Sequence, residues 1–300
     1  MRAVVMNAFG APDVLHVTDV PDAPEPGPGQ VRVSVRAAAI NPVDCQVRSG
    51  SKGGEPTVPL PMTLGWDLSG TVDAVGPDVT RFRAGNPVVG MSAQAATGLG
   101  TWAQRVTLGQ DLLAPAPESV PLADAAALPL GALSTYQALD RLNLPAGGSL
   151  LVTGGAGALG GFALQLARER GWYTAALVRP SDRDLARELG AGEVLTELPD
   201  APRYDALFET AGIASAIGAV RDGGQAVTVV PTAVPAAERG IHPVVSFVDQ
   251  DGALLERLVA LVDGRTLTVR IAHAFPFDAA AEAVALFEAG GVRGKVLLIP

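Results

Sequence analysis

The sequence has few of the residues that build disulfides, metal clusters or membrane spans. Its 300 residues include one cysteine, Cys45, so an internal disulfide and a four-cysteine zinc lobe are excluded. We expect Cys45 to be a small buried side chain. The three histidines, His16, His242 and His273, lack ligand spacing, and we expect them at surface or packing positions. No apolar run suggests a membrane helix or a signal peptide, which predicts a cytoplasmic protein.

Positive charge is also scarce. The chain has 22 lysines and arginines against 31 acidic residues, for a formal net charge of −9. Nucleic acid and anionic membranes are therefore not expected partners. An anionic cofactor would need a local positive site. What the chain has in quantity is apolar residues, at 48%, and its length suits two modest domains.

The pattern of the sequence changes along the chain. The first third is β-rich: residues 31–36 alternate with period two, and residues 70–76 and 87–91 are further short strands. Such spacing favours a barrel-like or sandwich-like domain. After about Pro121, strands and helices alternate, which predicts a parallel sheet covered by helices. The expected strands are 150–152, 174–178, 193–195, 205–208, 226–230 and 244–248, and the expected helices are 159–170, 182–189 and 252–262. The tail adds a strand near 268–272, a helix over 278–288 and a strand over 295–299.

A glycine-rich segment joins the first of these strands to a helix. Gly155, Gly157 and Gly160 fit the pattern G-x-G-x-x-G. Glycines allow a tight turn and let a diphosphate approach the bare backbone, while free N–H groups and the helix dipole favour the anion. The candidate cofactor-binding residues here are Gly154, Gly155, Ala156, Gly157, Ala158, Leu159 and Gly160. The alternative is a flexible turn without a ligand.

The end of the next strand bears on the choice of cofactor. NAD sites usually place an acidic residue there, whereas this strand runs into Arg179. Arg179, Ser181 and Arg183 suit a 2′-phosphate, because guanidinium matches phosphate in charge and geometry. Asp182 complicates this interpretation unless it points away at the helix start. Ser181 could instead cap that helix, and Arg183 could be a solvated charge. We favour NADPH over NADH.

Several motifs together resemble one family. The segments 38–44, 64–67 and 290–295, with the glycine-rich segment, are similar to the quinone oxidoreductase branch of the medium-chain dehydrogenase/reductase superfamily, the relatives of zeta-crystallin. The resemblance implies an α/β protein in which a GroES-like, β-rich catalytic domain accompanies a Rossmann-type doubly wound parallel sheet. The implied boundaries are 1–120 for the catalytic domain, 121–262 for the NADP-binding domain, and 263–300 for a return to the first domain. A homodimer is the family expectation.

The resemblance also implies a zinc-independent site. Zinc-using relatives have Cys where this chain has Asn41, and His-Glu where it has Trp66-Asp67. Asn41 is the expected catalytic residue, beside the nicotinamide and substrate. The remaining residues implied near the cofactor are Thr135, Thr210, Ala211, Phe247, Val248 and Lys295. Alternatives stay open. Asn41 could be a turn residue, Thr135 could bond its own helix, Phe247 could pack in a core, and Lys295 could be a surface charge.

Without zinc, the chemistry favours acceptors that carry the arriving charge themselves. Quinones and α,β-unsaturated carbonyls spread it over their own π systems, whereas an ordinary ketone needs a metal or a placed acid. We therefore expect an NADPH-dependent reductase of a small electrophilic acceptor. Its pocket walls are expected from 48–61 and 91–101, and its proton from water because no general acid is evident. The alternative is a non-catalytic NADPH-binding sensor or accessory protein.

Overall fold

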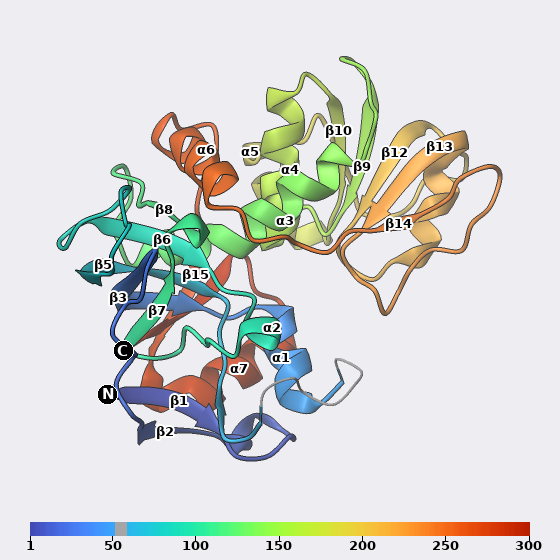
Figure 1. Cartoon of the computed structure of the whole chain (residues 1–300). Coiled ribbons are helices and arrows are strands. Elements are labelled where there is room, and N and C mark those ends of the chain that lie inside the picture. The colour runs from blue at the N-terminus through green and yellow to red at the C-terminus, as the bar shows by residue number, and fades with distance from the viewer. Residues whose placement is uncertain (52–58) are drawn as a thin grey trace. The chain divides into compact units, whose positions relative to one another are not determined.

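The computed structural model describes residues 1–51 and 59–300 and divides into two compact units (Figure 1). The first unit comprises Met1–Leu130, Gln250–Gly264 and Val269–Pro300, so it uses both ends of the chain. The second unit comprises Gly131–Asp249 and Arg265–Thr268. No helix within the described residues is long and apolar enough to cross a membrane.

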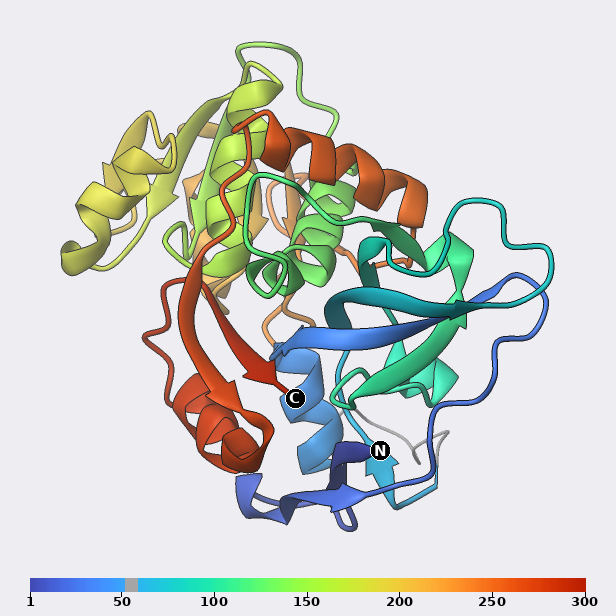
Figure 2. The same cartoon turned by 90° about the vertical axis from the view of Figure 1, so that its left-hand side faces the viewer.

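The first unit is built mainly from strands. Its larger sheet has the order β15-β16-β3-β5-β6-β8, with β7 paired to β3. These strands are β3 (Gln30–Ala39), β5 (Asp67–Val75), β6 (Pro87–Met91), β7 (Arg105–Gly109), β8 (Leu113–Pro115), β15 (Ile271–Pro276) and β16 (Lys295–Ile299). A smaller sheet contains β2 (Leu15–Asp19), β1 (Arg2–Met6) and β4 (Met62–Thr63) in that order. Strand β16 pairs with β15 on one side and with β3 on the other, so strands from the first and last parts of the chain share one sheet (Figure 2).

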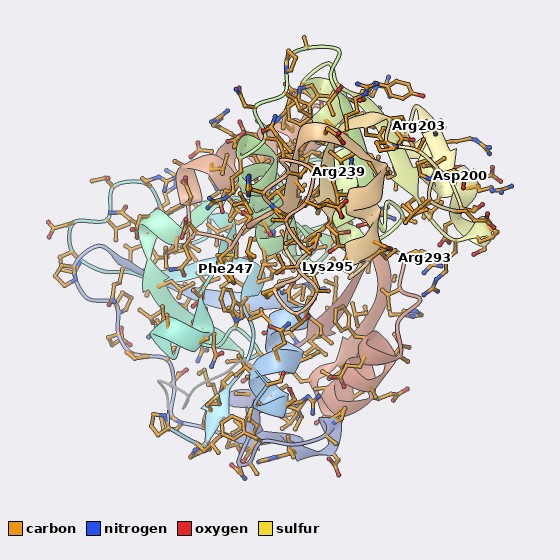
Figure 3. All side chains as sticks on the ribbon, turned by 90° about the vertical axis from the view of Figure 1, so that its right-hand side faces the viewer. Asp200, Arg203, Arg239, Phe247, Arg293 and Lys295 are labelled. Carbon is orange, nitrogen blue, oxygen red and sulfur yellow. The ribbon has the colours of Figure 1, made fainter. Side chains whose placement is uncertain are left out.

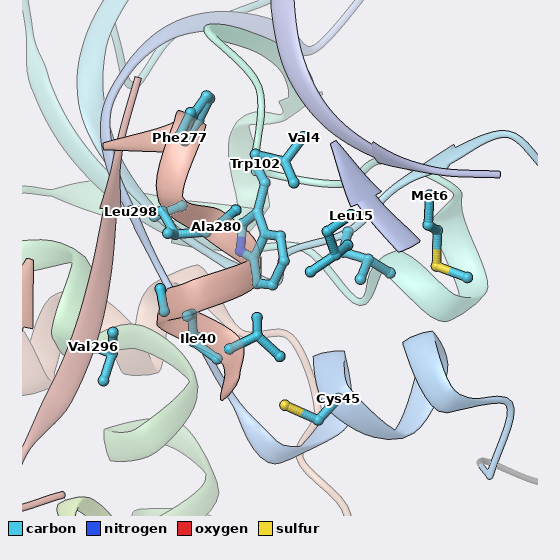
Figure 4. Packing of buried hydrophobic residues seen from close by; sticks show 14 of the residues in the cluster. Val4, Met6, Leu15, Ile40, Cys45, Trp102, Phe277, Ala280, Val296 and Leu298 are labelled. Atoms are coloured by element: carbon cyan, nitrogen blue, oxygen red, sulfur yellow. The ribbon is translucent and has the colours of Figure 1, made fainter. Parts of the chain in front are cut away.

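Apolar alternation and helix packing bury the core of this unit. On β3, Val31, Val33 and Val35 are buried while the residues between them face outward, as period-two patterning requires. The helices of the unit are α1 (Pro42–Ser49), α2 (Gln94–Thr97), α6 (Gly252–Asp263) and α7 (Ala280–Ala289). One apolar cluster collects side chains from distant segments around Trp102, which is fully buried (Figure 4). Cys45 belongs to this cluster, and the prediction that it is buried is confirmed.

The second unit is a six-stranded parallel sheet with helices. Its order is β11-β10-β9-β12-β13-β14, and every pairing is parallel. The strands are β9 (Ser149–Thr153), β10 (Tyr173–Leu177), β11 (Glu193–Leu195), β12 (Tyr204–Glu209), β13 (Val220–Thr228) and β14 (Val244–Val245). The helices are α3 (Pro129–Asp140), whose first two residues belong to the first unit, α4 (Ala158–Glu169) and α5 (Arg183–Glu188). The chain runs from β9 outward to β11, then returns to β12 on the other side. The strand order therefore reverses between β9 and β12, where open α/β sheets bind ligands.

The predicted fold class is confirmed, with differences in detail. The strand expected over 244–248 ends at Val245, because its partner strand β13 ends at Thr228. Beyond it, Gln137 binds the backbone of Asp249 through two hydrogen bonds of 2.9 Å. The strand expected near 268–272 begins only at Ile271, where pairing with Lys295 starts. Helix α6, expected in the Rossmann domain, packs in the first unit. Gly252 makes this possible, since a Cβ there would lie 2.3 Å from the Asp111 carbonyl oxygen.

Candidate functional site

The glycine-rich segment forms a strand–turn–helix in the second unit. Strand β9 ends at Thr153, Gly154 adopts a left-handed φ of 62°, and α4 begins at Ala158. The Gly157 N–H donates to the Gly154 carbonyl over 2.8 Å and closes the turn. A Cβ on Gly160 would lie 2.2 Å from the same carbonyl, so only glycine permits this approach. Among the described residues, no side chain caps the amino terminus of α4. Its first N–H groups therefore suit an anionic ligand.

The turn after β12 lies directly beside the glycine turn. The Thr210 hydroxyl donates to the Thr153 carbonyl over 2.6 Å, and the Thr210 N–H donates to the Thr153 hydroxyl over 2.8 Å. A Cβ on Gly154 would lie 3.0 Å from the Thr210 hydroxyl and 3.2 Å from the Ala211 Cβ. The structure therefore brings Thr210 and Ala211 together with Gly154, at the reversal point of the strand order.

The three residues expected to select NADPH follow β10 and are exposed. Among the described residues, the Arg179 guanidinium has no hydrogen bond or ion pair. Ser181 lies 3.5 Å from Asp182, a marginal contact, and the Arg183 guanidinium donates to the Thr196 hydroxyl over 3.1 Å. Asp182, the complication in the sequence, is buried. Two of the three side chains thus have local contacts, and Arg179 remains available.

The other residues expected near the cofactor in this unit differ in accessibility. Thr135 is fully buried, and its hydroxyl donates to the Gly131 carbonyl of the same helix over 2.8 Å. This bond to the backbone of its own helix is the alternative role expected for Thr135. Phe247 is 67% exposed, so core packing is wrong for it (Figure 3), while Val248 is partly buried. An exposed aromatic side chain after the edge strand β14 fits a contact surface better than a core.

In the first unit, Asn41 and Lys295 meet in a buried polar network. The Asn41 amide nitrogen donates to Asp67 Oδ2 over 2.9 Å, and its amide oxygen accepts from the Lys295 ammonium. Lys295 also lies 3.0 Å from Asp67 Oδ2, and the Leu130 N–H donates to Asp67 Oδ1 over 2.6 Å. Asp67 is fully buried and Lys295 is 4% exposed, so the surface role for Lys295 is wrong. The network fixes the Asn41 amide by using both of its ends.

A second carboxylate, Asp44, lies next to this network. Its Oδ2 accepts from the Asn41 N–H over 2.8 Å. Burial raises the pKa of Asp44 to about 7, and the nearby Asp67 charge adds to the rise while Lys295 opposes it. Near neutral pH, Asp44 is therefore divided between its acid and its carboxylate. This makes the surroundings of Asn41 sensitive to pH.

Sequence reasoning missed the acidic partners in both units. The sequence marks Asp67 only as the position of a zinc-family glutamate, and its motifs do not include Asp44 or Glu209. Glu209 directly follows the apolar run of β12, and an acidic residue at a strand end was the available signal. The surface expectation for the histidines is confirmed, since all three are exposed. The expected pocket wall 48–61 falls partly on residues 52–58, which lie outside the described residues.

Comparisons with known proteins agree with this architecture. Residues 27–118 match the alcohol dehydrogenase GroES-like domain, and residues 189–298 match a zinc-binding dehydrogenase domain. An NADPH-dependent alkenal/one oxidoreductase from Arabidopsis thaliana is 31% identical over 316 residues, covering 100% of this chain and 80% of the relative.

Two solved structures superpose along the whole chain. A quinone oxidoreductase from Coxiella burnetii has a TM-score of 0.90 at 28% identity, with 100% of this chain and 99% of that chain covered. An NAD-dependent alcohol dehydrogenase has a TM-score of 0.87 at 32% identity, with 100% of both chains covered. The chain belongs to the medium-chain dehydrogenase/reductase superfamily, in its quinone oxidoreductase-like branch.

Proposed function

We propose that this chain is an NADPH-dependent reductase of quinones or α,β-unsaturated carbonyls. The observation that carries the proposal is the glycine turn before the uncapped helix α4, with exposed Arg179 at the end of the neighbouring strand. The Arabidopsis relative is named for NADPH and for alkenals and alkenones, and the Coxiella structure is named for quinones. Those names agree with the chemistry that the residues favour.

The residues of the second unit suit a dinucleotide phosphate. The turn from Gly154 to Gly160 would hold the diphosphate at the amino terminus of α4. Arg179 would pair with the 2′-phosphate, with Ser181 and Arg183 beside it, because a fork of guanidinium donors matches phosphate oxygens. NADPH supplies a hydride when it is bound. Thr210 and Ala211 would line the side of the cofactor away from Arg179.

Zinc does not fit the residues around Asn41. Zinc takes Cys, His and carboxylate ligands in tetrahedral sites. Here the Asp67 oxygens already accept from Asn41, Leu130 and Lys295, and the Lys295 ammonium would repel a second cation. Within residues 1–51 and 59–300, no group of three His, Cys, Asp or Glu side chains is arranged to hold a metal ion. We therefore propose a reaction that uses no metal.

The first unit offers a fixed positive charge for the acceptor instead. Hydride addition to the β-carbon of an enone moves an electron pair onto the carbonyl oxygen, and water then supplies the proton. A lysine ammonium has three N–H donors, and Lys295 uses two of them on Asn41 and Asp67. The third has no acceptor among the described residues. In this proposal it stabilises the developing oxyanion, and Asn41 holds Lys295 in place.

Cofactor choice provides the direct test of the phosphate assignment. Arg179→Ala should weaken NADPH binding by about 1.5–3 kcal/mol, from the loss of a charged hydrogen bond, and leave NADH binding unchanged. Isothermal calorimetry with both nucleotides measures this. Arg187→Ala is the matched control, since Arg187 is an exposed arginine on α5 paired with Asp184. Equal losses for both nucleotides in Arg179→Ala would refute the assignment.

A further inference from the structure

Glu209 is a buried carboxylate at the carboxyl end of β12, and no role has yet been assigned to it. Its side chain is fully buried. Oε1 accepts from the Thr153 hydroxyl over 3.0 Å, from the Ala211 N–H over 2.9 Å and from the Ile213 N–H over 2.8 Å. Oε2 accepts from the Thr228 hydroxyl over 3.2 Å. All four contacting groups donate a hydrogen bond to Glu209, which suits a carboxylate because its oxygens only accept.

These donors surround the reversal point of the strand order. Thr153 ends β9, Thr228 ends β13, and residues 210–213 form the turn after β12. The carboxylate therefore joins three adjacent strand ends on the edge where ligands bind. It also fixes the turn that contains Thr210, whose hydroxyl would lie 3.0 Å from a Cβ placed on Gly154. The N–H groups of Ala211 and Ile213 in this turn would lose their acceptor without Glu209.

The opposite end of the same two strands offers a natural comparison. Asp205 is the second residue of β12 and Glu209 is the last. The Asp205 Oδ2 accepts from the Ser149 N–H and hydroxyl over 2.8 and 2.7 Å. An acidic residue of β12 thus bonds a hydroxyl residue of β9 at both ends. Between the two ends, the strands are paired from Leu150–Ala206 to Val152–Phe208. The pairing of β9 with β12 therefore does not depend on Glu209 alone.

We propose that Glu209 is a positioning residue that holds the turn 210–213 at a fixed distance from the glycine turn. At that distance the two turns together bind the nicotinamide half of the cofactor. The inference rests on the proposed NADPH function. A dinucleotide crosses the sheet at the reversal point, with its adenosine half over the β10 side and its nicotinamide half over the β12 side. A change at Glu209 should therefore affect the two halves of the cofactor unequally.

The test compares NADPH with 2′,5′-ADP, which keeps the adenosine half and lacks the nicotinamide. Calorimetry on the full chain should show that Glu209→Met binds NADPH about tenfold more weakly, because the orphaned N–H groups shift the turn. Binding of 2′,5′-ADP should change by less than about twofold. Glu209→Gln keeps an acceptor at Oε1 and can donate to the Thr228 hydroxyl, so it should restore most of the NADPH affinity.

Asp205→Asn is the matched control, since it alters the equivalent pair at the far end of β12. It should lower the melting temperature and leave both affinities unchanged. If Glu209→Met does not fold, Thr153→Val removes one donor to Glu209 and also the acceptor of the Thr210 N–H in the same turn. It should weaken NADPH binding about threefold while sparing 2′,5′-ADP.

The outcomes separate the two proposals. Wild-type protein that binds neither ligand would refute the NADPH function itself. Wild-type protein that binds both, together with parallel losses or no losses in the Glu209 and Thr153 variants, would overturn the positioning role alone.

Discussion

Removing the Lys295 ammonium should cost the first unit a large part of its stability. In Lys295→Met, the fully buried Asp67 keeps the Asn41 and Leu130 donors but loses the only cationic side chain that pairs with it among the described residues. An uncompensated buried charge costs about 3–5 kcal/mol. The double variant Asp67→Asn/Lys295→Met removes both charges and should recover at least half of that loss, because neutral replacements of buried pairs are well tolerated.

Urea unfolding followed by tryptophan fluorescence measures this effect. The chain has three tryptophans, Trp66, Trp102 and Trp172, and only Trp172 lies in the second unit. A Trp172→Phe background therefore makes the signal report on the first unit. The exposed pair Arg2–Asp278, with side chains 47% and 66% exposed, supplies the control. Arg2→Met should cost less than about 1 kcal/mol.

The result that refutes this reasoning is specific. If Lys295→Met loses no more stability than Arg2→Met, the buried pair is not the source of stability that its geometry implies. If the double variant is as unstable as the sum of its single variants, the two charges are not coupled.

Two further predictions concern Asp44 and the glycine turn. Because burial raises the pKa of Asp44 from 3.8 to about 7, the folded protein holds a proton that the unfolded chain releases. The stability of wild type relative to Asp44→Asn should therefore fall by up to about 4 kcal/mol between pH 4 and 7 and be constant above that range. Urea titrations at several pH values measure it, and a difference that rises with pH contradicts the burial argument. Gly160→Ala places a Cβ 2.2 Å from the Gly154 carbonyl oxygen, so it should lower both the melting temperature and NADPH affinity. Gly218→Ala, where nothing lies within 4 Å, should change neither; equal effects in the two variants would contradict the close-approach argument.

Local patterns predicted much of the second unit. The glycine turn could be predicted because the features that it needs lie next to one another in the sequence. They are a buried strand, residues with permissive backbone conformations, and a helix start within a few residues. The position of Arg179 could be predicted for the same reason, since it lies two residues after the apolar strand β10. The boundary of β14 could not be predicted locally, because it depends on where the partner strand β13 ends.

The polar network of the first unit shows where sequence reasoning ends. Lys295 and Asp67 are 228 positions apart, and nothing local indicates that a lysine in a strand will be buried against a carboxylate. Charged residues are seldom fully buried, so the surface alternative for Lys295 was reasonable from the residue type alone. Only the pairing of β16 with β3 brings Lys295 to Asn41.

The central claim is hydride transfer from NADPH to an electron-poor acceptor, and isotope transfer tests it most directly. The protein is incubated with a simple enone and NADPH that carries deuterium at both positions of the nicotinamide C4, and the product is analysed by NMR. We expect one deuterium at the former β-carbon, with none of it exchanged with water. Tight NADPH binding without deuterium in the product of any enone in a panel, and without NADPH oxidation by quinones, would contradict hydride transfer and favour a non-catalytic NADPH-binding protein.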